Sequence, residues 1–365
     1  MNKVTKFALL ACGAGLILIA IGFAITGGNW KSFAGKKSSA NHTHYEYECT
    51  GNITAIDFTD SYESVLITTG DVDKATVSYY VFEDHDQVDV KESNGTLYVE
   101  RKGLNNNSWV IFDFNFEDTR TVITLPKDFE GPVKADTTSG SISVKDLKNS
   151  DIEVKNSSGS IKLENIAKSG VISAKSTSGS VRANNLTSTG DITLEATSGS
   201  VNADTIKCKD LSAKASSGSV HVDNAECDNI TAQSNSGSVK VNNATVKSEI
   251  AGQSSSGSCR IEDSTCSSLE AKTSSGSVHL DEVKADTAKC ETTSGGIQLN
   301  KLDVTKSAAF NANSGSVHGT MVGKESDFSI ITSTTSGSCN LKGSRDGEKT
   351  LDATTTSGSI NIKFE

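Results

Sequence analysis

Seven basic side chains recur at intervals of 19, 20 or 39 residues, so chemically similar groups occupy equivalent positions of a repeat. They are Lys162, Arg182, His221, Lys240, Arg260, His279 and His318. A column of cations can bind an anionic wall polymer or the headgroups of anionic lipids. Acidic residues such as Glu164 and Glu262 follow two positions later, and outward strand positions are commonly charged. Mutual neutralisation of the two columns is therefore the competing interpretation.

Other candidate chemistry is weaker. The three histidines of the column are two or three repeats apart, which argues against a shared metal site. The segment Glu83-Asp84-His85-Asp86 lacks the spacing and the glycine of a calcium-binding loop. The sequence contains no nucleophile elbow, phosphate-binding loop or zinc-protease motif. We therefore expect no catalytic residue, no cofactor and no metal.

The elements that must position these residues form a repeat. Ser-Gly recurs from residue 139 onward, with successive glycines 19 to 22 residues apart. The glycines are Gly140, Gly159, Gly179, Gly199, Gly218, Gly237, Gly257, Gly276, Gly295, Gly315, Gly337 and Gly358. Such units cannot bury a core alone and must stack. The predicted fold is all-β: a β-solenoid of about twelve rungs of 19–20 residues, with equivalent positions about 4.8 Å apart.

Numbering each copy from its glycine predicts which side chains point inward. Positions −7, −5, −3 and −1 are assigned to one inward face, as at Ile152 and Val154. Apolar residues resume at +2 and +4, as at Ile161 and Leu163, and a third apolar column follows at +7. The step from −1 to +2 requires a corner. We expect glycine to supply positive φ there, and serine hydroxyls to satisfy the turn. The basic column lies at +3 and points outward.

Residues 7–25 form an uncharged run that is long enough to span a bilayer. The predicted organisation is a cytoplasmic tip and a transmembrane helix at 1–28, a flexible tether at 29–44, a β-rich capping region at 45–130 and the solenoid at 131–365. A cleaved signal peptide is the alternative, with Ser32-Phe33-Ala34 resembling a cleavage site. Lysines on both sides of the run leave its orientation open.

The two ends of the solenoid differ. Residues 45–130 hold alternating strand patterns and a hairpin signal at Asn94-Gly95, so we expect them to cover one end. The final strand at 359–363 has no evident cap. Its open edge is predicted to pair with another chain, which makes a homo-oligomer through the C-terminal edge strand possible.

Most cysteines fit the repeat as small core residues. Cys259 and Cys339 replace valine at +2, and Cys290 occupies −5. Cys208 and Cys227 fall at +9 of successive turns, and the sequence leaves open whether they are bonded. Numerous thiols argue against an oxidising exterior.

The order of an N-terminal anchor, a hairpin region, the strand at 121–126 and then Thr137-Thr138-Ser139-Gly140-Ser141-Ile142 resembles the DUF4097 family of bacterial adhesin-like proteins. The resemblance covers about residues 45–365. It implies a bacterial source and a cell-envelope location. The family motif consists of structural Ser-Gly turns, so the resemblance implies no catalytic residue.

The net charge of −10 excludes nucleic acid as a partner. We expect a non-enzymatic, single-pass plasma-membrane protein whose solenoid is extracytoplasmic. It would serve as an adhesin-like binding module or an envelope-stress-associated scaffold, with the membrane, a wall polymer or a surface protein as partners. Two alternatives are kept. One is a glycan-active β-solenoid enzyme, which would need paired carboxylates and stacking aromatics. The other is a cytoplasm-facing structural scaffold that self-associates through its open end.

Overall fold

The computed structural model describes residues 42–82, 86–103 and 118–365. The chain divides into two compact units, one of 1–45, 80–87 and 103–118 and a larger one of 46–79, 88–102 and 119–365. In the described part of the smaller unit, the rings of His42 and His44 lie 5.4 and 4.8 Å from that of Tyr80. The described ranges contain no helix that is long and apolar enough to cross a bilayer. The predicted anchor at 7–25 lies outside them.

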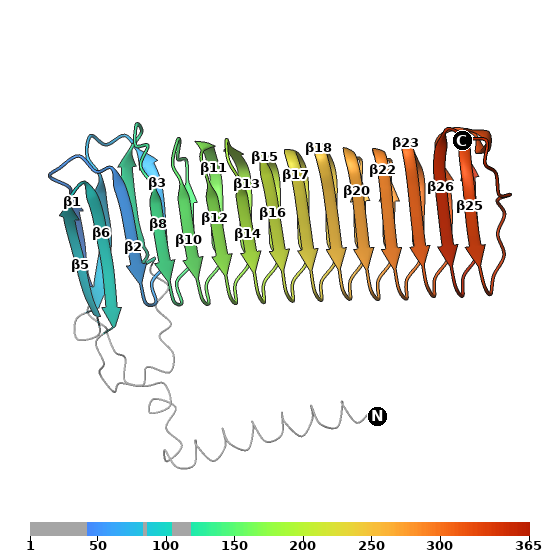
Figure 1. The fold of residues 1–365 in the computed structure, drawn as a ribbon. Coiled ribbons are helices and arrows are strands. Elements are labelled where there is room, and N and C mark those ends of the chain that lie inside the picture. Colours follow the sequence, from blue (N-terminus) through green and yellow to red (C-terminus); the bar gives the residue numbers. More distant parts are fainter. Residues whose placement is uncertain (1–41, 83–85, 104–117) are drawn as a thin grey trace, which may run out of the picture. The chain divides into compact units, whose positions relative to one another are not determined.

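The larger unit is an all-β solenoid (Figure 1). It has about 11 turns, whereas the twelve Ser-Gly copies predict about twelve. We call the strands that end at position −3 the first face and those that begin at +2 the second face. The first face contains β2 (Ala55–Asp60), β6 (Thr96–Gly103), β8 (Val133–Thr137), β10 (Ile152–Asn156), β12 (Ile172–Ser176), β14 (Ile192–Ala196), β16 (Asp210–Ala215), β20 (Thr265–Thr273), β22 (Lys284–Thr292), β25 (Phe328–Thr334) and β26 (Lys349–Thr355).

The second face contains β3 (Val65–Gly70), β7 (Thr121–Pro126), β9 (Ile142–Lys145), β11 (Ile161–Ser169), β13 (Val181–Ser188), β15 (Val201–Lys207), β19 (Cys259–Glu262), β21 (Val278–Asp281), β24 (Val317–Met321) and β27 (Ile360–Phe364). Three long strands bend from the second face into the first: β17 (Val220–Ser234), β18 (Val239–Ser254) and β23 (Ile297–Ala312). The remaining elements are β1 (His42–Glu48), β4 (Thr76–Phe82), β5 (Asp86–Ser93) and the 3-10 helix η1 (Glu325–Asp327).

Successive turns stack in parallel and in register, so each predicted column is a real line of side chains. Ile152 lies opposite Ile172, which lies opposite Ile192. The columns at −7, −5, −3, +2 and +4 are buried and form the core, which confirms those assignments. The assignment of −1 was wrong, because the first-face strand ends at −3 and residues such as Ser158 are exposed.

The Ser-Gly corner comprises positions −2 to +1. Its glycines are required because the backbones of successive turns approach closely there. A Cβ atom on Gly218 would lie 2.1 Å from the carbonyl oxygen of Gly199 in the preceding turn. The prediction of positive φ was wrong: none of the twelve repeat glycines adopts it, whereas Gly95, Gly319 and Gly323 do. Stacked turns simply leave no volume for a side chain at this position.

Hydroxyl groups satisfy the backbone at this corner. The flanking serines do so as predicted, with the Ser219 amide donating to Ser200 Oγ at 3.2 Å, and hydroxyls at −3 add to them. The buried Ser234 Oγ donates to the Gly218 carbonyl at 2.8 Å and accepts from the Gly237 amide at 2.9 Å. Four other residues at position −3 make the same two bonds: Ser176, Ser254, Thr273 and Thr292. Each hydroxyl therefore joins its own turn to the preceding one, which explains the preference for serine or threonine three residues before glycine.

A charged pair replaces this arrangement near the N-terminal end. Asp60 lies opposite Thr137 of the −3 column, and its Oδ1 accepts from the amides of Tyr62 and Glu63 at 2.9 Å. Its Oδ2 accepts from Arg101 Nε at 2.9 Å, and both side chains are 1% exposed. Burial raises the pKa of Asp60, against the opposing effect of these hydrogen bonds and of Arg101. At this end of the −3 column, a buried ion pair of opposite charges thus stands in place of the buried hydroxyl groups.

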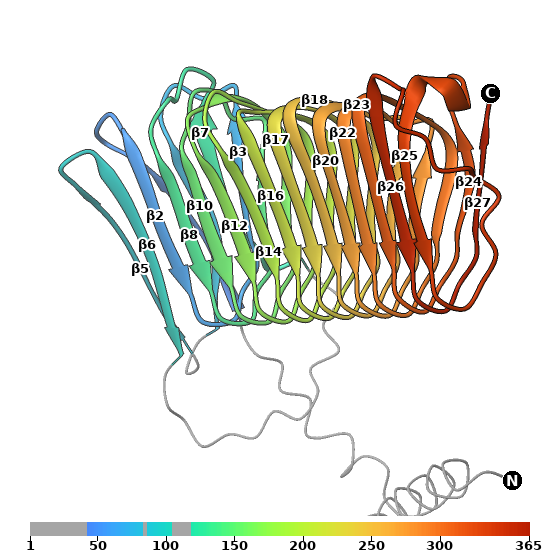
Figure 2. The same cartoon turned by 45° about the vertical axis from the view of Figure 1, so that its right-hand side comes forward.

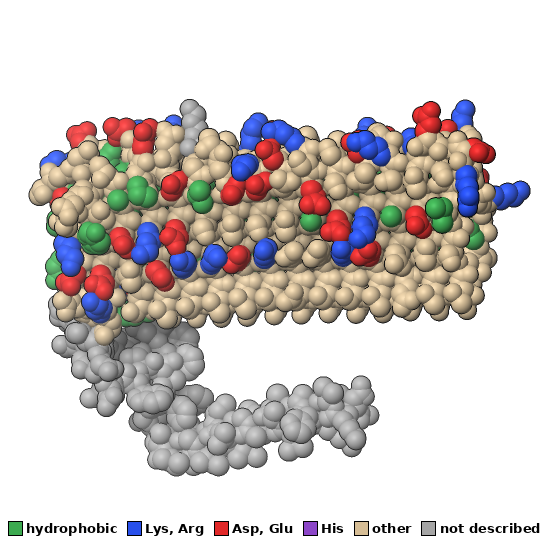
Figure 3. Space-filling view, in the orientation of Figure 1, with side chains coloured by type: hydrophobic (Ala, Val, Ile, Leu, Met, Phe, Trp, Pro, Cys, Tyr) green, Lys and Arg blue, Asp and Glu red, His purple; other side chains and the backbone are tan. Residues whose placement is uncertain are grey.

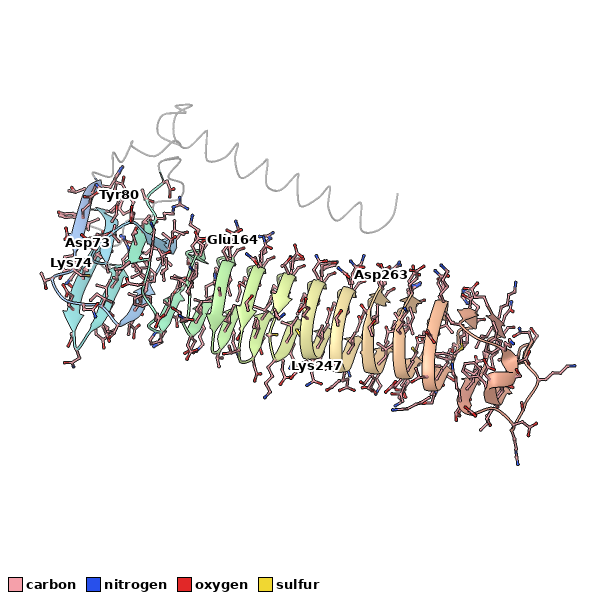
Figure 4. The ribbon with its side chains drawn as sticks, turned by 90° about the horizontal axis from the view of Figure 1, so that it is seen from above. Asp73, Lys74, Tyr80, Glu164, Lys247 and Asp263 are labelled. Atoms are coloured by element: carbon pink, nitrogen blue, oxygen red, sulfur yellow. The ribbon has the colours of Figure 1, made fainter. Side chains whose placement is uncertain are left out.

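A second corner, which we call the asparagine corner, lies at +5 and +6. Nine successive residues at +6 have φ between 47° and 60°: Asp146, Asn165, Asn185, Thr205, Asn224, Asn243, Asp263, Glu282 and Lys301. Side-chain amides bond along the column, with Asn185 Nδ2 donating to Asn165 Oδ1 at 2.9 Å. Figure 4 shows Glu164 and Asp263 along one long edge of the rod and Lys247 along the other. Asparagine predominates because it tolerates left-handed backbone.

At the N-terminal end, spatial order differs from chain order. β2 lies between β6 and β8, and β3 lies between β7 and β9. Parallel stacking thus begins before residue 131. β4 pairs with β7 in the antiparallel direction, which ends the parallel stack on the second face. Asn94 and Gly95 have φ of 51° and 76° between β5 and β6, as the predicted two-residue hairpin turn requires.

The C-terminal end is ordered in the same unexpected way (Figure 2). β26 lies between β23 and β25, so the last segment of the chain fills the penultimate turn. The predicted open edge at 359–363 was therefore misplaced. The Ile360 amide donates to the Ser338 carbonyl at 2.8 Å, and the Asn340 side chain bonds both the amide and the carbonyl of Ile362 at 3.0 and 2.7 Å. These contacts occupy backbone groups that would recruit another strand.

Candidate functional site

The structure brings the predicted basic residues into one column on the outward side of the second face. Lys162 lies opposite Arg182, and His221, Lys240, Arg260 and His279 occupy four successive turns. Asn202 separates Arg182 from His221, and Gln298 separates His279 from His318. The basic residues thus form one line of side chains that is interrupted at two turns.

Part of this column is neutralised by acidic neighbours. Lys162 Nζ lies 2.8 Å from Glu164. Lys240 and Arg260 share Glu262, at 2.8 and 3.1 Å. The three basic side chains are 36 to 54% exposed, so these pairs are weak and screened. They support the neutralisation interpretation for three of the seven residues.

The other members of the column are more available. Arg182, His221 and His318 form no ion pair with any described residue. His279 Nδ1 lies 3.1 Å from Gln298 Oε1. Burial and then the positive charge of Arg260 lower the pKa of His279, so its ring is held towards the neutral form. Use of the column as an anion-binding site stays a prediction.

The first face carries balanced charge. Lys272 lies 2.5 Å from Glu270 and 3.5 Å from Glu291, and Lys289 lies 2.8 Å from Glu291. In Figure 3 basic and acidic side chains are interspersed along the rod, while the lower edge shows no charged side chain. The Ser-Gly corner runs along that edge, below the arrowheads of the first-face strands in Figure 1.

A shallow polar hollow of about 480 Å³ crosses the first-face ends of β17, β18, β20, β22 and β23. It is lined by Gln233, Ser234, Asn235, Gln253, Ser254, Ser255, Lys272, Thr273, Ser274, Glu291, Thr292, Thr293, Asn311 and Asn313. Gln233 Nε2 donates to Gln253 Oε1 at 3.2 Å. Glu291 is the single carboxylate of this lining, and glycoside hydrolysis uses two. The hollow therefore offers hydrogen bonds and lacks the pair that the glycan-active alternative needs.

Among the residues that the structure describes, no group of three or more histidine, cysteine or acidic side chains could hold a metal ion. The segment 83–85 of the weak calcium candidate lies outside them. Cys259 and Cys290 are fully buried, and burial raises the pKa of Cys259 to about 12. Cys339 is only partly buried. The Sγ atoms of Cys208 and Cys227 are 3.3 Å apart.

The chain matches one family model and is similar to several solved structures. A family model described as Toastrack DUF4097 matches residues 53–245 and again 225–365. No curated protein matches the chain. A "putative adhesin" from Bacteroides fragilis is 12% identical, with 90% of this chain and 98% of that chain covered and a TM-score of 0.30. A "putative lipid binding protein" from Parabacteroides distasonis is 14% identical, with 89% and 98% covered and a TM-score of 0.27.

Proposed function

We propose that this protein, which belongs to the DUF4097 family, is a non-enzymatic binding rod that a membrane anchor holds at the bacterial cell surface. The predicted span at 7–25 would supply the anchor. The solenoid would face the outside and bind an extended anionic polymer along its axis. Phosphate-bearing wall polymers have that chemistry.

The in-register basic column carries this proposal. Lys240 lies opposite Arg260, and Arg260 lies opposite His279, so similar donors repeat at the spacing of the turns, about 4.8 Å. A polymer that lies along this line meets one weak contact per turn. Linked weak contacts add by effective concentration, so useful affinity needs no single strong site. The partial pairing with Glu262 makes each contact weaker and more sensitive to salt.

The binding of a poly(glycerol phosphate) teichoic acid to the full-length protein in detergent tests the proposal. We expect the affinity to fall at least about tenfold between 0.05 and 1 M salt, because the screening length shrinks to about 3 Å. The triple variant Arg182→Gln, Lys240→Gln, Arg260→Gln should lose binding at low salt. The matched control Lys155→Gln, Lys175→Gln, Lys272→Gln removes the same charge from the first face and should retain it.

Equal binding at both salt concentrations, or equal losses of binding in the two triple variants, would show that the basic column does not bind the polymer.

The polar hollow favours a second candidate ligand, a neutral polyhydroxylated polymer. Its lining of amides and hydroxyls offers both donors and acceptors. In that case Gln253→Ala should weaken binding of a neutral polysaccharide, and salt should have little effect.

A further inference from the structure

Two buried cysteines lie against each other on successive turns in the middle of the rod. Cys208 follows β15 and Cys227 lies in β17, at equivalent positions nine residues after their glycines. Their Sγ atoms are 3.3 Å apart, and both thiols are free. The two residues are 8% and 4% exposed. Equivalent positions on neighbouring turns are about 4.8 Å apart, within the 4.4–6.8 Å between Cα atoms that a disulfide spans.

We propose that Cys208 and Cys227 form a disulfide that staples the two turns together when the protein meets a low-molecular-weight disulfide. Closing the bond requires the sulfur atoms to approach from 3.3 Å to about 2.05 Å, with no change in the pairing of the strands. The neighbouring backbone is already fixed, because the Cys208 amide donates to the Glu226 carbonyl at 3.1 Å. The bond is independent of the ligand proposed above.

The chemistry is thiol–disulfide exchange. The Cys227 thiolate attacks one sulfur of the reagent R–S–S–R and releases the first R–S⁻. The Cys208 thiolate then attacks the Cys227 sulfur of the mixed disulfide and releases the second R–S⁻. Two electrons pass from the cysteines to the reagent, and the two thiol protons end on the two R–SH products. Hydrogen bonding from the Cys208 thiol lowers the pKa of Cys227, which favours Cys227 as the first nucleophile.

The same column supplies a matched control. Cys266 also lies nine residues after its glycine and is 6% exposed, yet its neighbours across the two adjacent turns are Val246 and Ala285. It shares the burial and the position of the pair but has no thiol partner in the column. Burial raises its pKa to about 12. Cys266 should therefore stay reduced under conditions that oxidise the pair.

The test is to expose the full-length protein in detergent to oxidised glutathione and then count free thiols after denaturation. Two of the eight thiols should disappear, and a non-reduced digest should link the peptides that contain Cys208 and Cys227. Cys227→Ser should keep all seven remaining thiols, while Cys266→Ser should still lose two. The oxidised wild type should also unfold at higher temperature than the reduced form, a shift that Cys227→Ser should lack.

Retention of eight thiols, or a link that involves another cysteine, would overturn the proposal. Equal thiol loss in Cys227→Ser would do the same. Because the readout is a covalent bond, it does not depend on polymer binding. Failure of the binding-rod function and failure of the disulfide are thus separable.

Discussion

Replacing Gly218 with alanine is expected to destabilise the centre of the rod by more than about 3 kcal/mol. The new Cβ would lie 2.1 Å from the Gly199 carbonyl oxygen and 2.6 Å from the Ser200 amide nitrogen. Both contacts are with backbone, so only separation of the turns can relieve them. Gly218 does not adopt a positive φ, so the expected loss of stability comes from these contacts. Chemical denaturation and hydrogen exchange of residues 196–220 measure the effect.

The control is Ser217→Ala, one residue earlier on the same corner. Ser217 is exposed, so its truncation should change stability by no more than about 0.5 kcal/mol. Contacts in a solenoid are mainly with adjacent turns, and loss of protection in Gly218→Ala should therefore be greatest around residues 199–218. Wild-type denaturation of Gly218→Ala would contradict the close-approach explanation of the repeat.

Truncation after Gly347 is expected to disorder residues 328–341 as well as remove the last two strands. β25 pairs with β26 along all seven of its residues, from Phe328 to Thr334. Removing β26 takes away that partner and uncovers the edge of β23, and removing β27 uncovers the edge of β24. We expect self-association by sedimentation velocity and rapid proteolysis between 322 and 347, because unpaired strand edges recruit other strands.

Truncation after Ile362 is the matched control, since it keeps β26 and both residues that bond to Ser338 and Asn340. This shorter truncation should sediment as a single species, as we expect of the full chain. A solenoid whose spatial order followed its chain order would lose only its outermost turn after the longer truncation. If residues 328–341 of the chain truncated after Gly347 resist proteolysis, the observed order of the C-terminal turns is contradicted.

The regular part of the fold was predictable because one short unit repeats. Each Ser-Gly fixes a corner, and the apolar columns at +2 and +4 fix the second face, so most of the core followed from the spacing, whereas position −1 was wrongly assigned to it. The asparagine corner was visible in Asn165, Asn185, Asn224 and Asn243 but was missed. Asparagine spaced by whole repeats is the signal for left-handed backbone that could have found it.

The order of turns at the ends could not be predicted in the same way. Every turn presents similar strand edges. The preference of one repeat for pairing with another is therefore nearly the same wherever the two repeats lie in the sequence. The longer spacings, 22 residues to Gly337 and 21 to Gly358, were the only indication that the chain crosses over a turn there. The basic column was placed correctly by register, but its ion pairs with Glu164 and Glu262 depend on side-chain conformations that spacing does not determine.

The proposed function depends most on which side of the membrane the rod occupies. We would treat intact cells that express the full chain with protease and probe for the solenoid, with lysed cells as the control. If the rod lies outside the cell, the solenoid signal should be lost from intact cells, or a resistant rod fragment should be released into the medium. Protection of the whole chain until lysis would contradict it and would favour the cytoplasm-facing scaffold.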